Sequence, residues 1–166
     1  MEDVIDRITG DLARIGVIAD TNGLAVTGRI LRLARIVESA RDGVLGEFGL
    51  SVADFDVMAT LRRRADSTGL KAKQLQASVM ITSGGMTKRL DRLESAGLIA
   101  RHPDPDDRRG VLITLTTEGR GVIDDALPAL LNAEARMIEE AIGSARDRQR
   151  LAGLLRHFLV GMDRRA

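Results

Sequence analysis

Hydrophobic residues recur at helical spacing along most of the chain. Residues 2–19 carry a loose apolar stripe that two glycines interrupt, which predicts a short, weak helix. Residues 26–37 carry a stronger stripe, with apolar side chains at i, i+4, i+7 and i+11. A further helix is expected over about residues 117–142, and a last apolar stripe occupies residues 151–162. Long amphipathic helices are therefore predicted at both ends of the chain.

The middle of the chain predicts three shorter helices. The first opens at Ser51, a suitable N-cap residue, and the second covers residues 70–79. The third covers residues 83–96, with Ser83 at its start. Gly97 is expected to end it, because a residue without a Cβ readily adopts the left-handed turn that follows many helices.

The apolar period then changes from that of a helix to that of a strand. Residues 99–100 and 111–116 alternate apolar side chains with small or polar ones, which predicts two half-buried strands. Between them lies RHPDPDDRRG, residues 101–110. Its prolines, Pro103 and Pro105, are expected to stop the ladder of hydrogen bonds and to make the loop project from the sheet.

Composition narrows the fold class and excludes several kinds of chemistry. The chain has three Phe, no Trp and no Tyr, so its core is aliphatic and a mainly helical fold is expected. It has no Cys, which excludes disulfides and thiolate metal sites. His102 and His157 lie far apart, and no nucleophile, phosphate-binding or metal-ligand motif is present. We expect no enzyme activity, no cofactor and no metal.

Charge and hydropathy indicate the partner and the compartment. The net charge is +1, yet residues 61–93 carry eight Lys or Arg against two Asp. One basic region in a near-neutral chain favours a nucleic-acid partner, although uneven charge also occurs on surfaces that bind nothing. No apolar run approaches the ~18 residues of a membrane span, and the N-terminus does not resemble a signal peptide. No membrane partner and a cytoplasmic location are expected.

The order helix, short helix, turn, helix, hairpin resembles a winged helix-turn-helix. From about Leu24 to Met162 the chain resembles the MarR family of bacterial transcription regulators. The resemblance lies in SGGMTKRLDRLESAGLI and in DPDDRRGVLITLT, which is similar to the family's wing signature of Asp, any residue, Arg. It implies a mainly α fold, a winged helix-turn-helix DNA-binding domain with N- and C-terminal dimerisation helices. The expected divisions are residues 1–47 and 117–166 for dimerisation and residues 48–116 for DNA binding.

The same resemblance implies a homodimer that regulates transcription, most often as a repressor, at a pseudo-palindromic operator in double-stranded DNA. The helix over residues 83–96 would enter the major groove, and the wing loop over residues 101–110 the minor groove. At about 100° per residue, Met86, Leu90 and Leu93 face the core and leave the opposite side free. By resemblance, Asp107 pairs with an arginine and supports the wing. The expected DNA contacts are Ser83, Thr87, Lys88, Arg92, Arg108, Arg109, Lys71 and Lys73.

The same resemblance implies a site for a small anionic effector, and the charged residues expected there are Asp56, Arg89 and Arg101. Arg89 lies about 60° from the centre of the apolar side of its helix and so borders the interior. An interior acid and base pair with each other or with a ligand. The pattern resembles the urate-responsive branch of the family, which has an extra N-terminal helix carrying a tryptophan. Leu12 stands at that position here. Three alternatives to urate binding therefore remain: another anion binds, no ligand binds, or Asp56 and Arg89 form a plain salt bridge.

Two alternatives lead to different functions or assemblies. The chain could be a helical protein-interaction module on a winged fold without DNA affinity, which predicts no salt-dependent binding to DNA. The terminal apolar stripes could also pack against each other within one chain instead of against a second copy. A plain amphipathic surface helix at residues 83–96 and a self-neutralising turn at residues 101–110 are the corresponding local alternatives.

Overall fold

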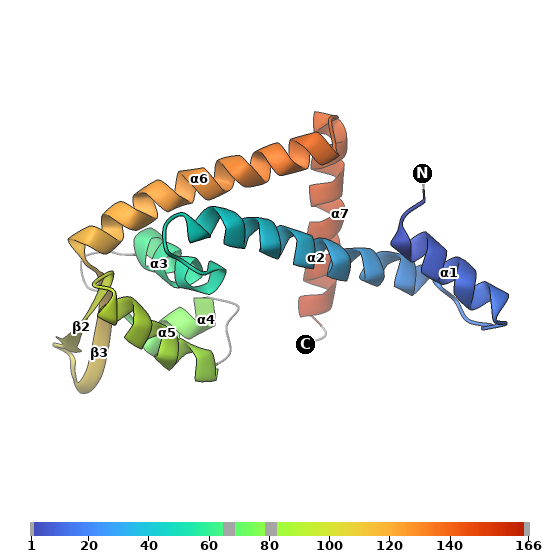
Figure 1. The fold of residues 1–166 in the computed structure, drawn as a ribbon. Coiled ribbons are helices and arrows are strands. Elements are labelled where there is room, and N and C mark those ends of the chain that lie inside the picture. The colour runs from blue at the N-terminus through green and yellow to red at the C-terminus, as the bar shows by residue number, and fades with distance from the viewer. Residues whose placement is uncertain (1, 65–68, 79–82, 165–166) are drawn as a thin grey trace. The chain divides into compact units, whose positions relative to one another are not determined.

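The computed structural model describes residues 2–64, 69–78 and 83–164, apart from the side chains of Ser78, Ser83 and Arg108. The chain divides into two compact units, Met1–Gly43 and Val44–Ala166. In chain order, the described elements are α1 Val4–Arg14, α2 Asn22–Gly46, α3 Val52–Arg64, β1 Leu70–Lys71, α4 Ala72–Ser78, α5 Ser83–Ser95, β2 Ile99–Asp104, β3 Asp107–Leu115, α6 Thr117–Ala141 and α7 Ala145–Asp163 (Figure 1).

The first unit consists of α1 and most of α2, which are joined by charge and by close packing. Asp3 and Asp6 form a reciprocal capping box at the start of α1. Arg29 of α2 donates to both carboxylates, from Nε to Asp3 Oδ2 at 2.8 Å and from Nη2 to Asp6 Oδ1 at 2.6 Å. The pKa of each aspartate lies below its ordinary value because of the backbone hydrogen bonds within the box and then because of Arg29. Ile5 is buried against Gly28.

The second unit has an aliphatic core between α3, α4, α5, α6 and a small sheet. Met86, Leu90 and Leu93 of α5 are buried in it, which confirms the predicted facing of that helix. Burial of each such side chain contributes about 1.5–3 kcal/mol. The other large, fully buried apolar side chains of this core are Leu45, Val57, Met58, Leu61, Leu75, Ile99, Ile113 and Ile123.

The sheet is antiparallel, with strand order β1-β3-β2. Its two-residue first strand pairs with β3, Leu70 opposite Ile113 and Lys71 opposite Leu112. The sequence had assigned both residues to the start of the short helix, which is wrong. Two residues are too few to show an alternating pattern, so β3 rather than the local sequence defines this strand.

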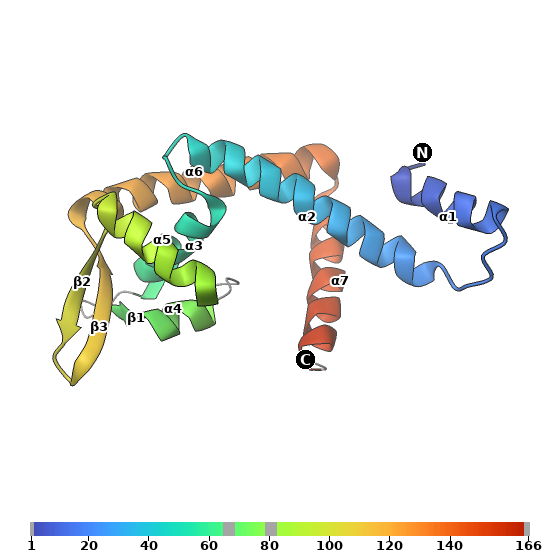
Figure 2. The same cartoon turned by 60° about the horizontal axis from the view of Figure 1, so that its bottom comes forward.

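The hairpin formed by β2 and β3 is longer than expected. It projects from the helices in both views, with its turn at the free end (Figures 1 and 2). The ladder runs from Ile99 opposite Leu115 to Pro103 opposite Val111, and its register shifts between Pro103 and Asp104. The expectation that Pro103 stops the ladder is therefore wrong. Because β2 is an edge strand, its proline loses no N–H that the ladder needs.

A compact joint connects the hairpin to α5 and α6. Gly97 has a φ of +72°, which confirms the predicted left-handed turn after α5. Thr116 caps α6, since its hydroxyl accepts from Gly119 N at 2.9 Å, and it donates to the Gly97 carbonyl at 2.6 Å. Gly119 lies against the carbonyl of Leu98, and an added Cβ would collide with that oxygen. The end of the hairpin therefore fixes the start of α6.

The last helix, α7, carries its apolar stripe on the surface. None of its described residues is buried. Six large apolar side chains follow the predicted helical spacing and are exposed: Leu151, Leu154, Leu155, Phe158, Leu159 and Met162. Among the described residues, no helix is both long and apolar enough to span a membrane.

Candidate functional site

The α5 helix presents polar side chains on the side opposite the core. Thr87 and Lys88 are exposed, whereas Met86 and Leu90 beside them are buried. Lys73, on the short helix α4, is exposed as well. A helix with free cations and a hydroxyl on one side has the chemistry needed for phosphate oxygens and base edges in a major groove.

A buried carboxylate joins α5 to the start of α3. Asp54 has a fully buried side chain; it accepts from Arg89 Nη1 at 3.3 Å and forms an ion pair with Arg92, whose Nη2 lies 3.0 Å from Oδ2. Ser51 also donates to it, from its hydroxyl at 2.6 Å and its backbone N–H at 3.0 Å. Both arginines come from α5, one turn apart. This cluster therefore fixes the position of α5 against α3.

Sequence reasoning gave the role of interior acid to Asp56, whereas the acid that Arg89 contacts here is Asp54. Asp56 is half-buried on the same helix. A signal for Asp54 was present, because Ser51 followed three residues later by an acid is a helix-start pattern. The capping box turns that carboxylate inward, toward Arg89.

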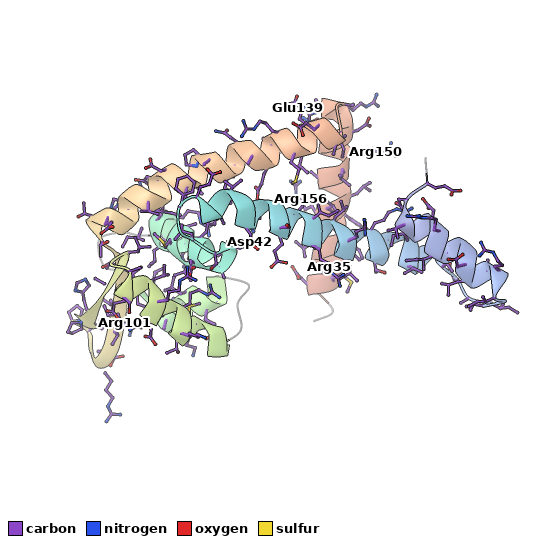
Figure 3. The ribbon with its side chains drawn as sticks, in the orientation of Figure 1. Arg35, Asp42, Arg101, Glu139, Arg150 and Arg156 are labelled. Carbon is purple, nitrogen blue, oxygen red and sulfur yellow. The ribbon has the colours of Figure 1, made fainter. Side chains whose placement is uncertain are left out.

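Arg101 connects α5 to the base of the hairpin. Its guanidinium donates to Glu94 Oε2 at 2.6 Å and to Asp91 Oδ1 at 2.7 Å, and both acids belong to α5. In Figure 3, Arg101 lies where α5 and the hairpin meet. The residue expected to bind an effector therefore holds these two elements together.

The hairpin tip, residues 104–109, contains an ion cluster. Lys71 of β1 places its ammonium 2.7 Å from Asp104 Oδ2 and 3.2 Å from Asp107 Oδ2. The Lys71 hydrogen bond lowers the pKa of Asp104. The backbone N–H of Arg109 and then Lys71 lower the pKa of Asp107. The hydrogen bonds that Lys71 donates to both carboxylates, that to Asp104 foremost, raise the pKa of Lys71.

Two expectations concern this cluster. Asp107 was expected to pair with an arginine side chain; among the described residues it accepts from Lys71 and from the backbone N–H of Arg109, the latter at 3.0 Å. Lys71 was expected to contact DNA, and in the free chain its ammonium is paired with the hairpin. The Arg109 side chain is exposed. The side chains of Ser83 and Arg108, also expected at the DNA, lie outside the described part of the structure.

The basic run after α3 is also engaged in the fold. Arg62 donates bidentately to Asp124 of α6, with Nε 2.6 Å from Oδ1 and Nη2 3.3 Å from Oδ2. Arg63 donates to the carbonyl of Ala59 and to the hydroxyl of Thr60. Cations counted in a sequence window are thus not all available to a partner.

A concavity of about 240 Å³ lies in the first unit and differs from the expected effector site. It is lined by Asp3, Ile5, Arg29, Arg32, Leu33 and Ile36. None of the expected effector residues lines it. Leu12 is half-buried on α1 of the same unit, whereas Asp56, Arg89 and Arg101 belong to the second unit.

Comparison with known proteins gives a consistent result. The family model described as the MarR family matches residues 50–111. The HTH-type transcriptional regulator PecS of Dickeya dadantii is 36% identical over 128 residues, covering 77% of this chain and 70% of PecS. A MarR variant from E. coli complexed with operator DNA has a similar fold (TM-score 0.72, 24% identity, 86% of this chain and 99% of that one). CouR from Rhodococcus jostii, bound to p-coumaroyl-CoA, has a TM-score of 0.67 at 27% identity, covering 86% of this chain and 92% of CouR.

Proposed function

The chain belongs to the MarR family, and from this premise we propose that it is a sequence-specific regulator of transcription that binds operator DNA as a homodimer. Its role is binding and regulation, not catalysis, and it acts in the cytoplasm because its DNA target lies there. Residues 48–116 form the DNA-binding part, with dimerisation parts at residues 1–47 and 117–166.

The observation that carries this proposal is the exposed face of α5, a helix that four ion pairs hold in place. Thr87 and Lys88 lie on that face, while Asp54 fixes one side of the helix and Arg101 connects it to the hairpin. A rigidly held helix of this kind can present the same side chains to a major groove at every encounter. Thr87 and Lys88 contact base edges, and Lys73 contacts a phosphate. Arg92 contacts a phosphate as well, through the exposed part of a guanidinium that stays paired with Asp54.

The hairpin supplies the second contact with DNA. Arg109 is exposed next to the turn, at the end of the hairpin that projects from the helices (Figure 2). The minor groove is narrow and strongly negative, which favours an inserted guanidinium. Arg109 enters it, and Arg108 provides a further cation.

Dimerisation follows from the uncovered apolar stripe of α7. Leu155, Phe158 and Leu159 of α7 are all exposed. A contiguous exposed apolar patch of this kind marks an interaction surface. A second copy of this chain covers the stripe. Two copies also supply two recognition helices, which match half-sites about 34 Å apart on one face of the duplex.

Titration against the DNA upstream of its own gene tests the proposed function. We expect tighter binding to this DNA than to a scrambled duplex, and an affinity that falls steeply between about 50 and 200 mM salt. Lys88→Ala and Arg109→Ala each weaken specific binding about tenfold or more. Arg146→Ala, which removes an exposed cation from α7, is the matched control and leaves affinity unchanged. Equal affinity for both duplexes would contradict the proposal and favour the protein-interaction module.

The regulator is a ligand-responsive repressor in this proposal, and its effector is a small anion. Support comes from the arginine and carboxylate groups that meet at the joint between α5, α3 and the hairpin. A thermal-shift screen of anionic metabolites, urate included, identifies such a ligand, since binding to the folded state alone raises stability by RT ln(1 + [L]/Kd). A hit that stabilises the protein but leaves DNA affinity unchanged would contradict the regulatory role.

A further inference from the structure

We propose that Lys71 is a positioning residue for the hairpin. Its ammonium joins the tip carboxylates to β1 and thereby holds Arg109 in its DNA-binding conformation, without contacting DNA itself. The link to DNA binding rests on the proposed function. The ion cluster itself is a property of the free chain and is testable without DNA.

The contacts of Lys71 cross both strands of the hairpin. Its ammonium lies 2.7 Å from Asp104, the last residue of β2, and 3.2 Å from Asp107, the first residue of β3. It therefore bridges the two sides of the turn. The backbone of Lys71 is fixed in turn, since it pairs with Leu112 and its N–H donates to Gln74 Oε1 at 2.8 Å.

The burial of Asp104 makes this contact more than a surface ion pair. Only 6% of its side chain is exposed. Its second oxygen, Oδ1, accepts from the backbone N–H of Asp106 at 3.0 Å. Gly110 leaves the space that the carboxylate fills, because a Cβ there would lie 2.7 Å from Asp104 Cβ. A carboxylate so enclosed needs a cation, and Lys71 supplies it.

The same carboxylates also hold the main chain of the hairpin tip in place. Asp107 Oδ1 accepts from the N–H of Arg109, and Lys71 holds the other oxygen of the same carboxylate. The conformation of Arg109 is thus connected to β1 through one aspartate. Lys71 also neutralises carboxylates that would otherwise repel a phosphate backbone beside the minor groove.

Amide hydrogen exchange in the free protein tests the positioning role. In Lys71→Met, the amides of Asp106 and Arg109 should exchange about fivefold faster or more, because the carboxylates that accept from them lose their anchor. Asp104→Asn should have the same effect at Asp106, whose N–H donates to that carboxylate. Lys73→Met removes an exposed lysine two positions away and should leave these amides unchanged. Unchanged exchange in Lys71→Met would overturn the proposal.

A double-mutant cycle on DNA separates positioning from direct contact. If Lys71 acts through Arg109, Lys71→Met weakens binding about fivefold in the wild-type background and very little in Arg109→Ala. The same substitution combined with Lys88→Ala should give the product of the two separate effects. A full effect of Lys71→Met in the Arg109→Ala background would assign Lys71 to a phosphate and overturn its positioning role. Failure of the wild-type chain to bind its upstream DNA would refute the proposed function, while the exchange result would still decide the role of Lys71 in the free hairpin.

Discussion

Asp54 is a fully buried carboxylate that accepts from Ser51 and Arg89 and is paired with Arg92. Removing one member of a buried ion pair destabilises the fold, because the remaining groups lose both their counter-charge and their hydrogen-bond partner. Here those partners include arginines of α5. A single residue therefore connects the stability of the fold to the placement of the helix proposed to contact DNA.

We expect Asp54→Ala to lower the free energy of unfolding by about 3 kcal/mol, since it removes a buried charge with its arginine contacts and a helix-capping side chain. Urea denaturation followed by circular dichroism measures this. Asp125→Ala, which removes an exposed carboxylate of α6, should change stability by less than about 0.5 kcal/mol. A cost below about 1 kcal/mol for Asp54→Ala would mean that the cluster does not hold α3 and α5 together.

At the scale of elements, the joint between the hairpin and α6 determines how the parts of the second unit connect. The backbone N–H of Thr116 donates to the Leu98 carbonyl at 3.1 Å, and Gly119 lies against the same oxygen. This leaves no room for a side chain at position 119 in the first turn of α6. The two elements meet through their backbones, so the angle between them does not depend on flexible side chains.

Gly119→Ala should destabilise the protein by about 3 kcal/mol, because the added methyl group collides with a backbone oxygen that has little freedom to move. Gly121→Ala in the same helix is the matched control, since its Cβ would meet open space. That substitution should stabilise the protein by about 0.5–1 kcal/mol through helix propensity. Thermal unfolding of the two variants checks both signs. Equal stability of the two would show that the α6 joint is loose.

At the scale of the whole molecule, the uncovered stripe of α7 is the strongest argument for assembly. Leu151, Leu155 and Phe158 lie on one side of the helix at 100° per residue, and Gln149 lies on the other. Every one of these residues is exposed in the single chain. Family membership supports the same conclusion, namely that a second copy covers this side.

Phe158→Glu should convert the dimer to a monomer, because it places a charge in the centre of the apolar interface. Sedimentation velocity measures the change in mass, and DNA affinity should fall by at least about tenfold because the two half-sites are then bound separately. Gln149→Glu introduces the same charge on the opposite side and should leave both the mass and the affinity unchanged. A monomeric wild-type protein would contradict the dimer, as would a Phe158→Glu variant of unchanged mass.

The elements that follow from local sequence were predicted without the structure. Apolar spacing placed α2, α5 and α7, and Gly97 marked where α5 ends. The core-facing side of α5 also followed from its period. Each of these depends on residues within a few positions of one another, for which side-chain spacing and backbone preference suffice.

The pairing of charges and the length of the hairpin came from the fold, not from the local sequence. Lys71 and Asp107 are 36 positions apart, and Arg89 and Asp54 are 35 apart. No local pattern states which carboxylate a distant cation meets, so the contact of Lys71 with the hairpin was not predicted and Asp54 was passed over as an interior acid. The strand β1 and the ladder through Pro103 likewise exist because β3 lies beside them. Pairing across a fold depends on the positions of the backbones, and these are set by the packing of the whole core.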